Sequence, residues 1–445
     1  MRKPFLLVLF CAIAWAQAPL TLEDCRRLAH EHNAEVKTAQ MELESSSETR
    51  QEAFTKYFPQ VSATAGAMVA KDPLISEQTP QMNLPVYDGN LANLASATQS
   101  AYVPSMDLQA GKWANVLSLT VQQPLFVGGR VVNGNRLASL GEEVSRSKVR
   151  LAQRDAVAQA EEKYWSLLSL QEKRRTLDAY DSLLASLQRQ VDGAVKGGLT
   201  SRNDLLKVSL QRSGLRTRRL QLESGLRLSV RDLRQHLGLP EDSVLALADT
   251  LVEPVDPGTL REDGQDALGR RIEASLLAQG VEAEHLQAQI EAGAMLPTVA
   301  VGATAMRAEL KGVDPVSNVI GFAMVSVPIS DVWSGTHATR VHRIKEREAS
   351  LKEAEMRRKI VLGIDKDWDD LERSYQEALV ADDAVVQADV NLAEETDRQR
   401  NGLSTFSDLL EAQALRQKAK DERIDARKAY WLARSAYLRS LGKDD

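Results

Sequence analysis

Apolar residues recur along this chain with two different periods, and each period predicts a different kind of element. In the first long stretch, 130–195, they step by three and four positions, and no Pro interrupts them. Such spacing forms the seam of a coiled coil, as in the series Leu177, Tyr180, Leu184, Leu187 and Val191. A second stretch without Pro covers 335–400. We therefore expect two very long helices, each of about 100 Å at a rise of ~1.5 Å per residue.

Apolar and more polar residues alternate in four shorter segments, clearly in 58–70 and 115–127 and less cleanly in 297–309 and 318–330. A period of two belongs to a strand with two unlike faces. Each segment has about the 10 residues that a tilted strand needs to cross a bilayer. Taken singly, each segment would also fit an ordinary sheet in a soluble domain.

The second part of the chain repeats the first. Positions 204 apart carry matching residues, among them Pro124 and Pro328, Gly198 and Gly402, Asp204 and Asp408, and Leu237 and Leu441. Nearer the start of each repeat the separation is 238, as between Pro59 and Pro297. The difference of 34 residues falls in 71–112, where Pro, Asn, Ser and Gln give the composition of a loop. We infer an internal duplication, because unrelated helices would not keep one offset through strand and turn residues alike.

Each repeat is predicted to run through helix, strand, loop, strand, very long helix, tight turn and helix. In 17–238 these elements are a helix over 22–56, strand 58–70, loop 71–112, strand 115–127, long helix 130–195, turn 197–203 and helix 204–237. A linker of mixed type with Pro covers 239–259. In 260–445 they are a helix over 260–294, strand 297–309, loop 311–317, strand 318–330, long helix 335–400, turn 401–407 and helix 408–441.

The first 16 residues are typical of an export signal. Arg2 and Lys3 precede a short apolar run over 5–13, and Ala14 and Ala16 supply the small residues of a cleavage site. We expect cleavage after Ala16. The mature chain would then keep a single thiol, Cys25, which forms neither an internal disulfide nor a thiolate metal site.

Composition and charge exclude several classes of protein. The 445 residues carry 62 acidic and 56 basic side chains, a formal net charge of −6, which gives no electrostatic case for nucleic acid as a partner. With 43% apolar residues the chain can form a packed core, and only 5% are aromatic. No run of 18 apolar residues follows the signal, so we expect no transmembrane helix.

No arrangement of residues suggests catalysis, a cofactor or a metal. The six His residues include no His-Glu-x-x-His pair, and we expect them at the surface. The glycines of 193–198 have the spacing of a phosphate loop, but they lack its following Lys and its strand. We therefore predict a protein that is not an enzyme.

The duplicated layout and three groups of residues resemble the TolC-like outer membrane efflux proteins, and the resemblance covers essentially the whole mature chain. The groups are Tyr57-Phe58-Pro59 with Met295-Leu296-Pro297 before the first strand of each repeat, the run from Gln123 to Gly129 after a second strand, and the twin turns 198–206 and 402–410. The chain departs from the family pattern in two places. Val327-Pro328-Ile329-Ser330 lacks the paired glycines, and Asn33 is followed by Ala34 where the family often has Pro.

The resemblance implies an α+β membrane protein that acts as a homotrimer. Three chains with four strands each would close a 12-stranded β-barrel in outer membrane lipid, and the long helices would continue it as a coiled-coil α-barrel in the periplasm. The loops 71–112 and 311–317 would face outside the cell, and the linker 239–259 would pack around the waist. Such a channel is the exit duct of a tripartite efflux pump or type I secretion system, with a periplasmic adaptor and an inner-membrane transporter as partners.

The resemblance also assigns roles to residues at the helical turns. Contact with the adaptor falls to Gly198, Leu199 and Thr200 in one turn and to Gly402, Leu403 and Ser404 in the other. Any helical hairpin would also favour Gly at such a turn.

Acidic rings narrow the periplasmic entrance in the family, and alignment on Gly402 puts Asp408 and Glu411 at those positions. In the first repeat the equivalent residues are Asp204 and Lys207, so the acidic pair is not duplicated. The simpler interpretation of Asp408 is a carboxylate that stabilises the start of its helix.

Two other classes compete with the channel hypothesis. A soluble periplasmic coiled-coil scaffold would use the four strands as a small sheet, although their similar lengths disfavour it. A secreted enzyme lacks any arrangement of acid, base and nucleophile. The cargo, the adaptor and the pump are not specified by the sequence.

Overall fold

The structure of the chain is a computed structural model, which describes residues 19–73, 75–86, 99–110, 112–243, 245–311 and 313–443. The signal peptide expected over 1–16 lies outside the described residues. The chain divides into two compact units. The sheet unit is Glu48–Ser139 with Ala283–Glu346, and the helical unit is Met1–Ser47, Leu140–Glu282 and Arg347–Asp445. Each is described by itself.

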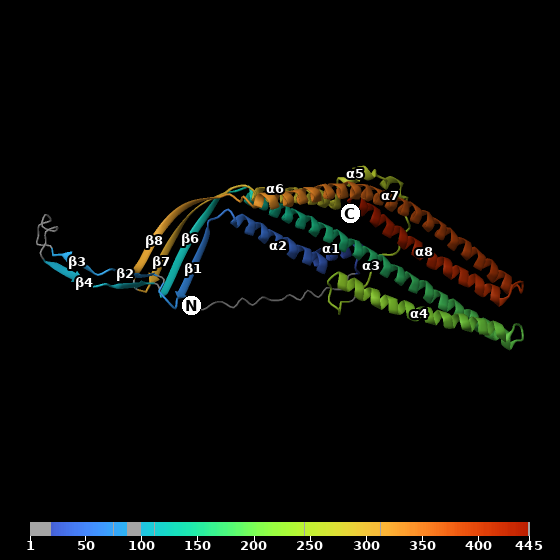
Figure 1. Ribbon diagram of the computed structural model, residues 1–445. Coiled ribbons are helices and arrows are strands. Elements are labelled where there is room, and N and C mark those ends of the chain that lie inside the picture. Colours follow the sequence, from blue (N-terminus) through green and yellow to red (C-terminus); the bar gives the residue numbers. More distant parts are fainter. Residues whose placement is uncertain are drawn as a thin grey trace, which may run out of the picture. The chain divides into compact units, whose positions relative to one another are not determined.

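A four-stranded antiparallel sheet forms the centre of the sheet unit (Figure 1). Its order is β1 (Gln60–Val69), β6 (Trp113–Val127), β7 (Thr298–Leu310) and β8 (Val313–Ser326). The ladder between β6 and β7 therefore pairs a strand of the first repeat with a strand of the second. β1 and β8 lie at the two edges, and among the described residues no strand pairs with the outer side of either.

The segment 71–112, predicted as a loop, contains two further ladders. β2 (Ile75–Gln78) pairs with β5 (Asp107–Ala110), and β3 (Met82–Pro85) pairs with β4 (Ser100–Val103). The loop prediction is wrong for these residues. Pro80 and Pro104 lie between the ladders, where a residue without a backbone N–H interrupts no strand.

The loop predicted over 311–317 is also wrong, because β8 already begins at Val313. Pro315 lies within that strand. An edge strand tolerates Pro, since one side of its backbone has no hydrogen-bonding neighbour. The register shifts between Ala308 and Leu310, opposite this Pro, as expected where a strand carries an irregularity.

The register gives the four-stranded sheet two different faces. Residues in register lie on the same face. One row across the sheet is Val61, Val121, Ala303 and Gly321, and the row two positions along it is Ala63, Leu119, Ala305 and Val319. The opposite face carries Ser62, Thr120 and Thr304, and the last two hydroxyls are 3.0 Å apart. This second face is thus polar across β1 and β6 and more apolar across β8, where Ile320 lies opposite Thr304 and Phe322 opposite Gly302.

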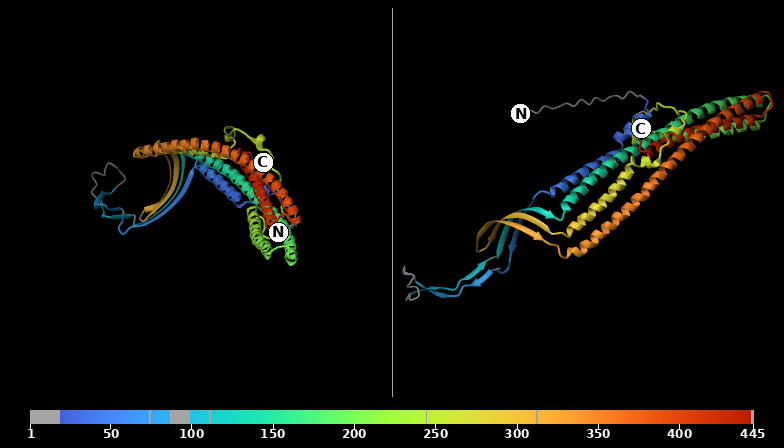
Figure 2. Two further views of the ribbon diagram at one scale, coloured as in Figure 1. Left: turned by 90° about the vertical axis from the view of Figure 1, so that its right-hand side faces the viewer. Right: turned by 90° about the horizontal axis from the view of Figure 1, so that it is seen from above.

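The helical elements are α1 (Leu22–His32), α2 (Ala34–Thr55), α3 (Arg130–Lys196), α4 (Arg202–His236), the 3₁₀ turn η2 (Pro257–Leu260), α5 (Gly264–Leu268), α6 (Ile272–Ala294), α7 (Asp331–Arg400) and α8 (Phe406–Ser440). α3 and α4 form one helical hairpin, and α7 and α8 form another (Figures 1 and 2). None of the helices in the described residues is long and apolar enough to cross a membrane.

Two of the expected helices are interrupted. The helix expected over 22–56 divides at Asn33, whose side chain accepts a hydrogen bond from the backbone N–H of Glu35 at 2.8 Å and donates one to the carbonyl of His236 at 3.1 Å. A side chain that bonds nearby backbone competes with a continuous helix. The helix expected over 260–294 begins only at Ile272, after η2 and α5.

The helical unit has two equivalent cores, one in each repeat. Ala160, Tyr164, Leu167, Leu233 and Leu237 lie in the first, and residues 204 positions later, Ile364, Trp368, Leu371, Tyr437 and Leu441, lie in the second. The duplication seen in the sequence is thus also a duplication of packing.

Buried tyrosines attach the linker 239–259 to these cores. Tyr164 donates its hydroxyl to the carboxylate of Asp249 at 2.5 Å, and Tyr430 donates to the carbonyl of Val255 at 2.5 Å. Leu20 pairs with Leu247 in a short parallel bridge. Buried phenol groups need such partners, so the linker completes the hydrogen bonding of the cores.

Gly128 and Gly293 lie against each other in the sheet unit, where β6 gives way to α3 and α6 ends. A Cβ on Gly293 would lie closer to the carbonyl oxygen of Gly128 than van der Waals contact allows. Gly128 also has a φ of 66°, which disfavours any other residue. The two backbones can approach this closely only because neither residue has a side chain.

We expect Gly293→Ala to lower the free energy of unfolding by about 1–3 kcal/mol, because the added methyl group forces a backbone shift. Gly280→Ala is the matched control on the same helix. Its Cβ would meet nothing within 4 Å, and the gain in helix propensity should stabilise by up to about 1 kcal/mol. Thermal unfolding of both variants in detergent checks the opposite signs; equal midpoints would contradict the close approach.

Candidate functional site

Both helical hairpins turn through the same backbone motif. In the α3–α4 turn, Gly198 has a φ of 71°, and the N–H of Leu199 bonds to the carbonyl of Ala194 at 2.8 Å. In the α7–α8 turn, Gly402 has a φ of 74°, and the N–H of Leu403 bonds to the carbonyl of Arg398 at 2.8 Å. This is the Schellman arrangement, which needs a left-handed residue at its centre. A Cβ at either position would meet nothing within 4 Å. Glycine is therefore needed for its positive φ and not because a side chain would lack space.

The helix that follows each turn begins with an acidic residue held by hydroxyls. The carboxylate of Asp408 accepts hydrogen bonds from the N–H of Thr405 at 2.9 Å, its hydroxyl at 2.7 Å and the hydroxyl of Ser404 at 3.3 Å. Thr405 accepts in return from the N–H of Asp408 at 3.2 Å, which completes a capping box. Asp204 receives the hydroxyls of Thr200 and Ser201, each at 2.8 Å.

These hydrogen bonds keep both carboxylates charged. The backbone N–H of Thr405, followed by its hydroxyl, holds the pKa of Asp408 below its usual value. The hydroxyl of Thr200, followed by that of Ser201, lowers the pKa of Asp204 in the same way. Thr405 is thus the N-cap of α8, and Asp408 completes its capping box, in line with the simpler interpretation of a carboxylate that stabilises the start of its helix. Asp408 is also an exposed negative charge near the turn.

The structure brings the starts of α4 and α8 together. The ammonium group of Lys207 donates to the hydroxyl of Ser407 at 2.7 Å, and that hydroxyl donates to the carboxylate of Asp204 at 3.4 Å. Beneath them, Leu187, Val191, Val208 and Leu409 form one buried cluster. This cross-contact was not predicted, because it joins residues about 200 positions apart with no local signal.

The six residues predicted for the adaptor contact differ in exposure. Leu199 and Leu403 are 85% and 71% exposed, so both turns present a bare apolar side chain. The hydroxyls of Thr200 and Ser404 are used inside the turns, and Ser404 also donates to Glu395 at 2.5 Å. Of the predicted set, the leucines are thus the side chains available to a partner.

Glu411 lies one turn of helix beyond Asp408 and is exposed. Two carboxylates therefore lie near the start of α8, whereas α4 has Asp204 and Lys207 joined as a pair at 3.9 Å. The described residues contain no group of three His, Cys, Asp or Glu side chains that could hold a metal ion.

The His prediction was incomplete. His285 contacts Glu346 and His342 contacts Glu284, each at 3.0 Å, so two of the six connect α6 with α7. Their partners lie about 60 positions away, beyond the reach of a local sequence pattern.

Comparison with known proteins identifies the fold. No family model and no curated protein match the chain by sequence. Among solved structures, the outer membrane protein VceC of Vibrio cholerae aligns with 95% of this chain and 96% of its own, at 15% identity and a TM-score of 0.74. The outer membrane channel CmeC of Campylobacter jejuni covers 97% of this chain and 90% of its own, at 12% identity and a TM-score of 0.73. The open state of the MtrE channel of Neisseria gonorrhoeae covers 95% and 88%, at 14% identity and a TM-score of 0.73.

The chain thus has the fold of these outer membrane channels over nearly its whole length. The resemblance expected from the strand and turn motifs is confirmed for the fold.

We expect Thr405→Ala to loosen the first turn of α8, because a lost helix cap costs about 1 kcal/mol. Amide hydrogen exchange of residues 406–409 should then accelerate by roughly fivefold at a constant pH. Thr405→Ser keeps a hydroxyl at the cap and serves as the control with near-native exchange. Unchanged exchange in Thr405→Ala would show that the capping box does not hold this turn.

Proposed function

We propose that the chain is the exit duct of an outer membrane export system, acting as a homotrimer with its helices in the periplasm. The observation that carries the proposal is the four-stranded sheet. Its apolar face is exposed, with Val61 at 64%, Leu119 at 49% and Val319 at 71%, and its other face is polar across β1 and β6. A strand that separates lipid from water needs this alternation.

The two open edges of the sheet support a trimer. In lipid, each unpaired backbone group costs several kcal/mol, so a four-stranded sheet is not stable there alone. Pairing β1 of one copy with β8 of the next would satisfy both edges. Three copies would give 12 strands in a closed barrel, the state expected from the sequence resemblance. The register leaves β1 and β8 free for this pairing.

Arg307 and Glu309 are charged residues two positions apart on the apolar face, and they fit this arrangement. Arg307 lies in register with Leu117, near the end of β7, and its guanidinium pairs with Glu309 at 2.9 Å. Charged side chains are tolerated near the membrane surface and are costly at its centre. We place this end of the sheet, with the ladders of 71–112, toward the outside of the cell.

The helical turns are the proposed meeting point with the other components. The exposed Leu199 and Leu403 next to the glycines would contact a periplasmic adaptor, and an inner-membrane transporter would drive export through it. Both leucines are anchored by the Schellman turns, so binding would order little additional chain. In this proposal the protein carries substrates from the periplasm to the outside and performs no reaction on them.

Asp408 and Glu411 are the proposed constriction. Three copies around an axis would place six carboxylates near the periplasmic entrance. Like charges repel and attract cations, so such rings would favour cations in the pore. The capping hydrogen bonds that lower the pKa of Asp408 would keep this charge in mildly acidic surroundings.

The trimer is tested by expressing the full chain in a Gram-negative host and fractionating its membranes. We expect the protein in the outer membrane fraction, extracted only by detergent, with a mass by light scattering of three chains plus detergent. A monomer released with the soluble periplasm would contradict the proposal and favour a periplasmic scaffold.

The constriction is tested by replacing both Asp408 and Glu411 with Ser and recording single channels in planar bilayers. We expect a higher conductance and a weaker preference for cations, because the ring loses its charge and bulk. Glu422→Ser, at an exposed carboxylate further along α8, is the control and should leave both unchanged. Native conductance and selectivity in the double variant would place the constriction elsewhere.

A further inference from the structure

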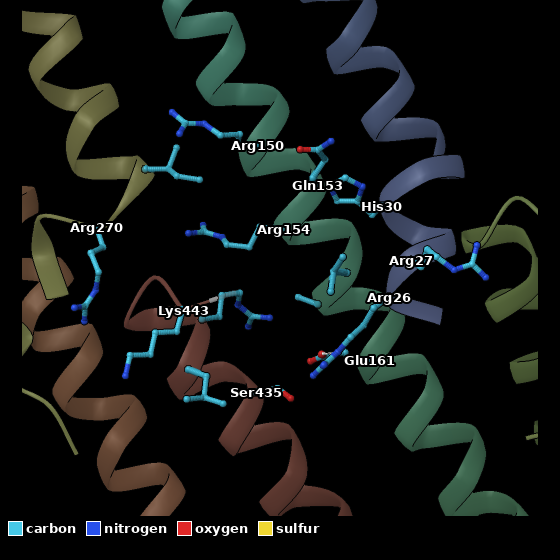
Figure 3. A pocket seen from close by; sticks show the side chains of 15 residues that line it. Arg26, Arg27, His30, Arg150, Gln153, Arg154, Glu161, Arg270, Ser435 and Lys443 are labelled. Carbon is cyan, nitrogen blue, oxygen red and sulfur yellow. Dashed lines mark hydrogen bonds and ion pairs between the residues drawn. The ribbon is translucent and has the colours of Figure 1, made fainter. Parts of the chain in front are cut away.

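A basic pocket lies in the helical unit between α1, α3, α8 and the start of α6 (Figure 3). Its volume is about 480 Å³. Of its 15 lining residues, seven are Arg or Lys and one, Glu161, is acidic. A protein with a formal net charge of −6 thus concentrates positive charge in one cavity.

Five of the seven cations already have carboxylate partners. Arg26 pairs with Glu161 at 2.5 Å, and Arg154 pairs with Glu273. Arg270 and Lys443 share the carboxylate of Glu262, and Arg27 pairs with Asp24 at 3.2 Å. These pairs neutralise part of the charge and hold the side chains around the cavity.

The other two guanidinium groups lack such partners. Arg150 contacts the hydroxyl of Ser147 at 3.3 Å. In the part of the chain that the structure describes, neither Arg150 nor Arg439 has a carboxylate within the 4.0 Å of an ion pair. Asp155 and Asp367 interact with Arg439 electrostatically at longer range, but neither Arg150 nor Arg439 is held in an ion pair with a carboxylate, so both guanidinium groups remain available at the cavity.

A third donor at the pocket is buried without an acceptor. The side chain of Arg154 is only 8% exposed, and its Nε has no hydrogen-bond partner among the described residues. Figure 3 shows it reaching from α3 toward the side of the pocket that carries Arg270 and Lys443. A buried donor of this kind destabilises the protein unless an acceptor satisfies it.

Positive charges also lie close together next to the cavity, around Arg271. Burial lowers the pKa of the neighbouring Arg271, and the charges of Arg154 and Arg439 lower it further, although Glu273 and Asp367 oppose them. A negative charge in the pocket would relieve this repulsion.

We propose that the pocket binds an organic anion that carries phosphate groups. Guanidinium groups match phosphate in geometry and form strong charge-assisted hydrogen bonds with it. The volume lies within the roughly 300–1,000 Å³ of small-molecule sites and exceeds what a single inorganic ion fills. The same chemistry is offered by a soluble phosphate ester and by a phospholipid headgroup.

Such a ligand would connect the two repeats. Arg150 and Arg154 belong to α3 of the first repeat, whereas Arg439 belongs to α8 of the second. A ligand held by all three would link these helices and raise the thermal stability of the helical unit. This role is separate from conduction and does not depend on it.

Binding is tested by titrating the full chain in detergent with tripolyphosphate in a calorimeter. We expect saturable heat, a higher thermal midpoint, and weaker binding as salt rises, because salt screens the charges. The double variant Arg150→Gln with Arg439→Gln should lose about tenfold or more in affinity, since it removes the two guanidinium groups without carboxylate partners. Arg216→Gln, at an exposed arginine of α4 outside the pocket, is the matched control and should bind as the native chain does.

The source of the ligand is distinguished by competition. Displacement of tripolyphosphate by short-chain phosphatidylglycerol supports a lipid headgroup, and displacement by fructose 1,6-bisphosphate alone supports a soluble ester. The proposal is overturned if the native chain shows no saturable binding, if the double variant binds normally, or if Arg216→Gln loses as much. Arg439→Lys, which keeps the charge but not the planar fork, should bind with intermediate affinity even if the double variant fails to fold.

Discussion

The ladder between β6 and β7 is the interaction on which the sheet unit depends. Thirteen residue pairs, from Ala114 with Leu310 to Val127 with Thr298, join a strand of each repeat. Because successive side chains point to opposite faces, a slip of one residue would exchange the apolar and polar faces. The register thus decides that Leu119 and Val121 share a face with alanines of β7, while Thr120 meets Thr304 on the other. The close approach of Gly128 and Gly293 lies just beyond the end of the same ladder.

In the helical unit, the duplication keeps the positions of the core and changes their chemistry. Tyr164 in one core corresponds to Trp368 in the other, and Leu233 corresponds to Tyr437. The tyrosines have a second function, because their buried hydroxyls bond to backbone or to Asp249 along the linker region. Tyr437 accepts from the N–H of Glu262 at 3.0 Å in this way. Residues that differ between the two repeats therefore supply the hydrogen bonds that hold the segment between them.

Asp408, near the α7–α8 turn, has a role both in the structure and in the proposed function. An ionised carboxylate at the third helical residue strengthens a capping box, and a constriction that selects cations needs an exposed negative charge near the entrance. Asp408 meets both conditions, since the hydrogen bonds that start the helix also favour the charged form. The corresponding Asp204 is paired with Lys207, which compensates its charge. The two turns therefore share a backbone conformation but differ in the charge near the start of the following helix.

Much of the fold follows from local features of the sequence. The apolar steps of three and four residues in 130–195, the absence of Pro from 335–400, the period of two in the strands, and Gly198 and Gly402 at the turns each act within a few residues, and the structure has the corresponding elements. The capping of α8 by Thr405 and Asp408 is equally local, because its spacing of three residues is visible in the sequence.

Other features arose only from tertiary structure, because they bring together residues that are distant in the chain. The ladders within 71–112 pair strands of only four residues each, which are too short for a period to mark them in the sequence, and the division at Asn33 involves His236. The same holds for the contact of Lys207 with Ser407. The basic pocket collects Arg26, Arg154, Arg270 and Arg439 from four separate segments, each of which alone carries ordinary surface charge. The sequence by itself determined the elements and their duplication, since these depend on local periodicity and backbone conformation; only the packed structure decided which charges meet, since that depends on how distant helices fold against one another.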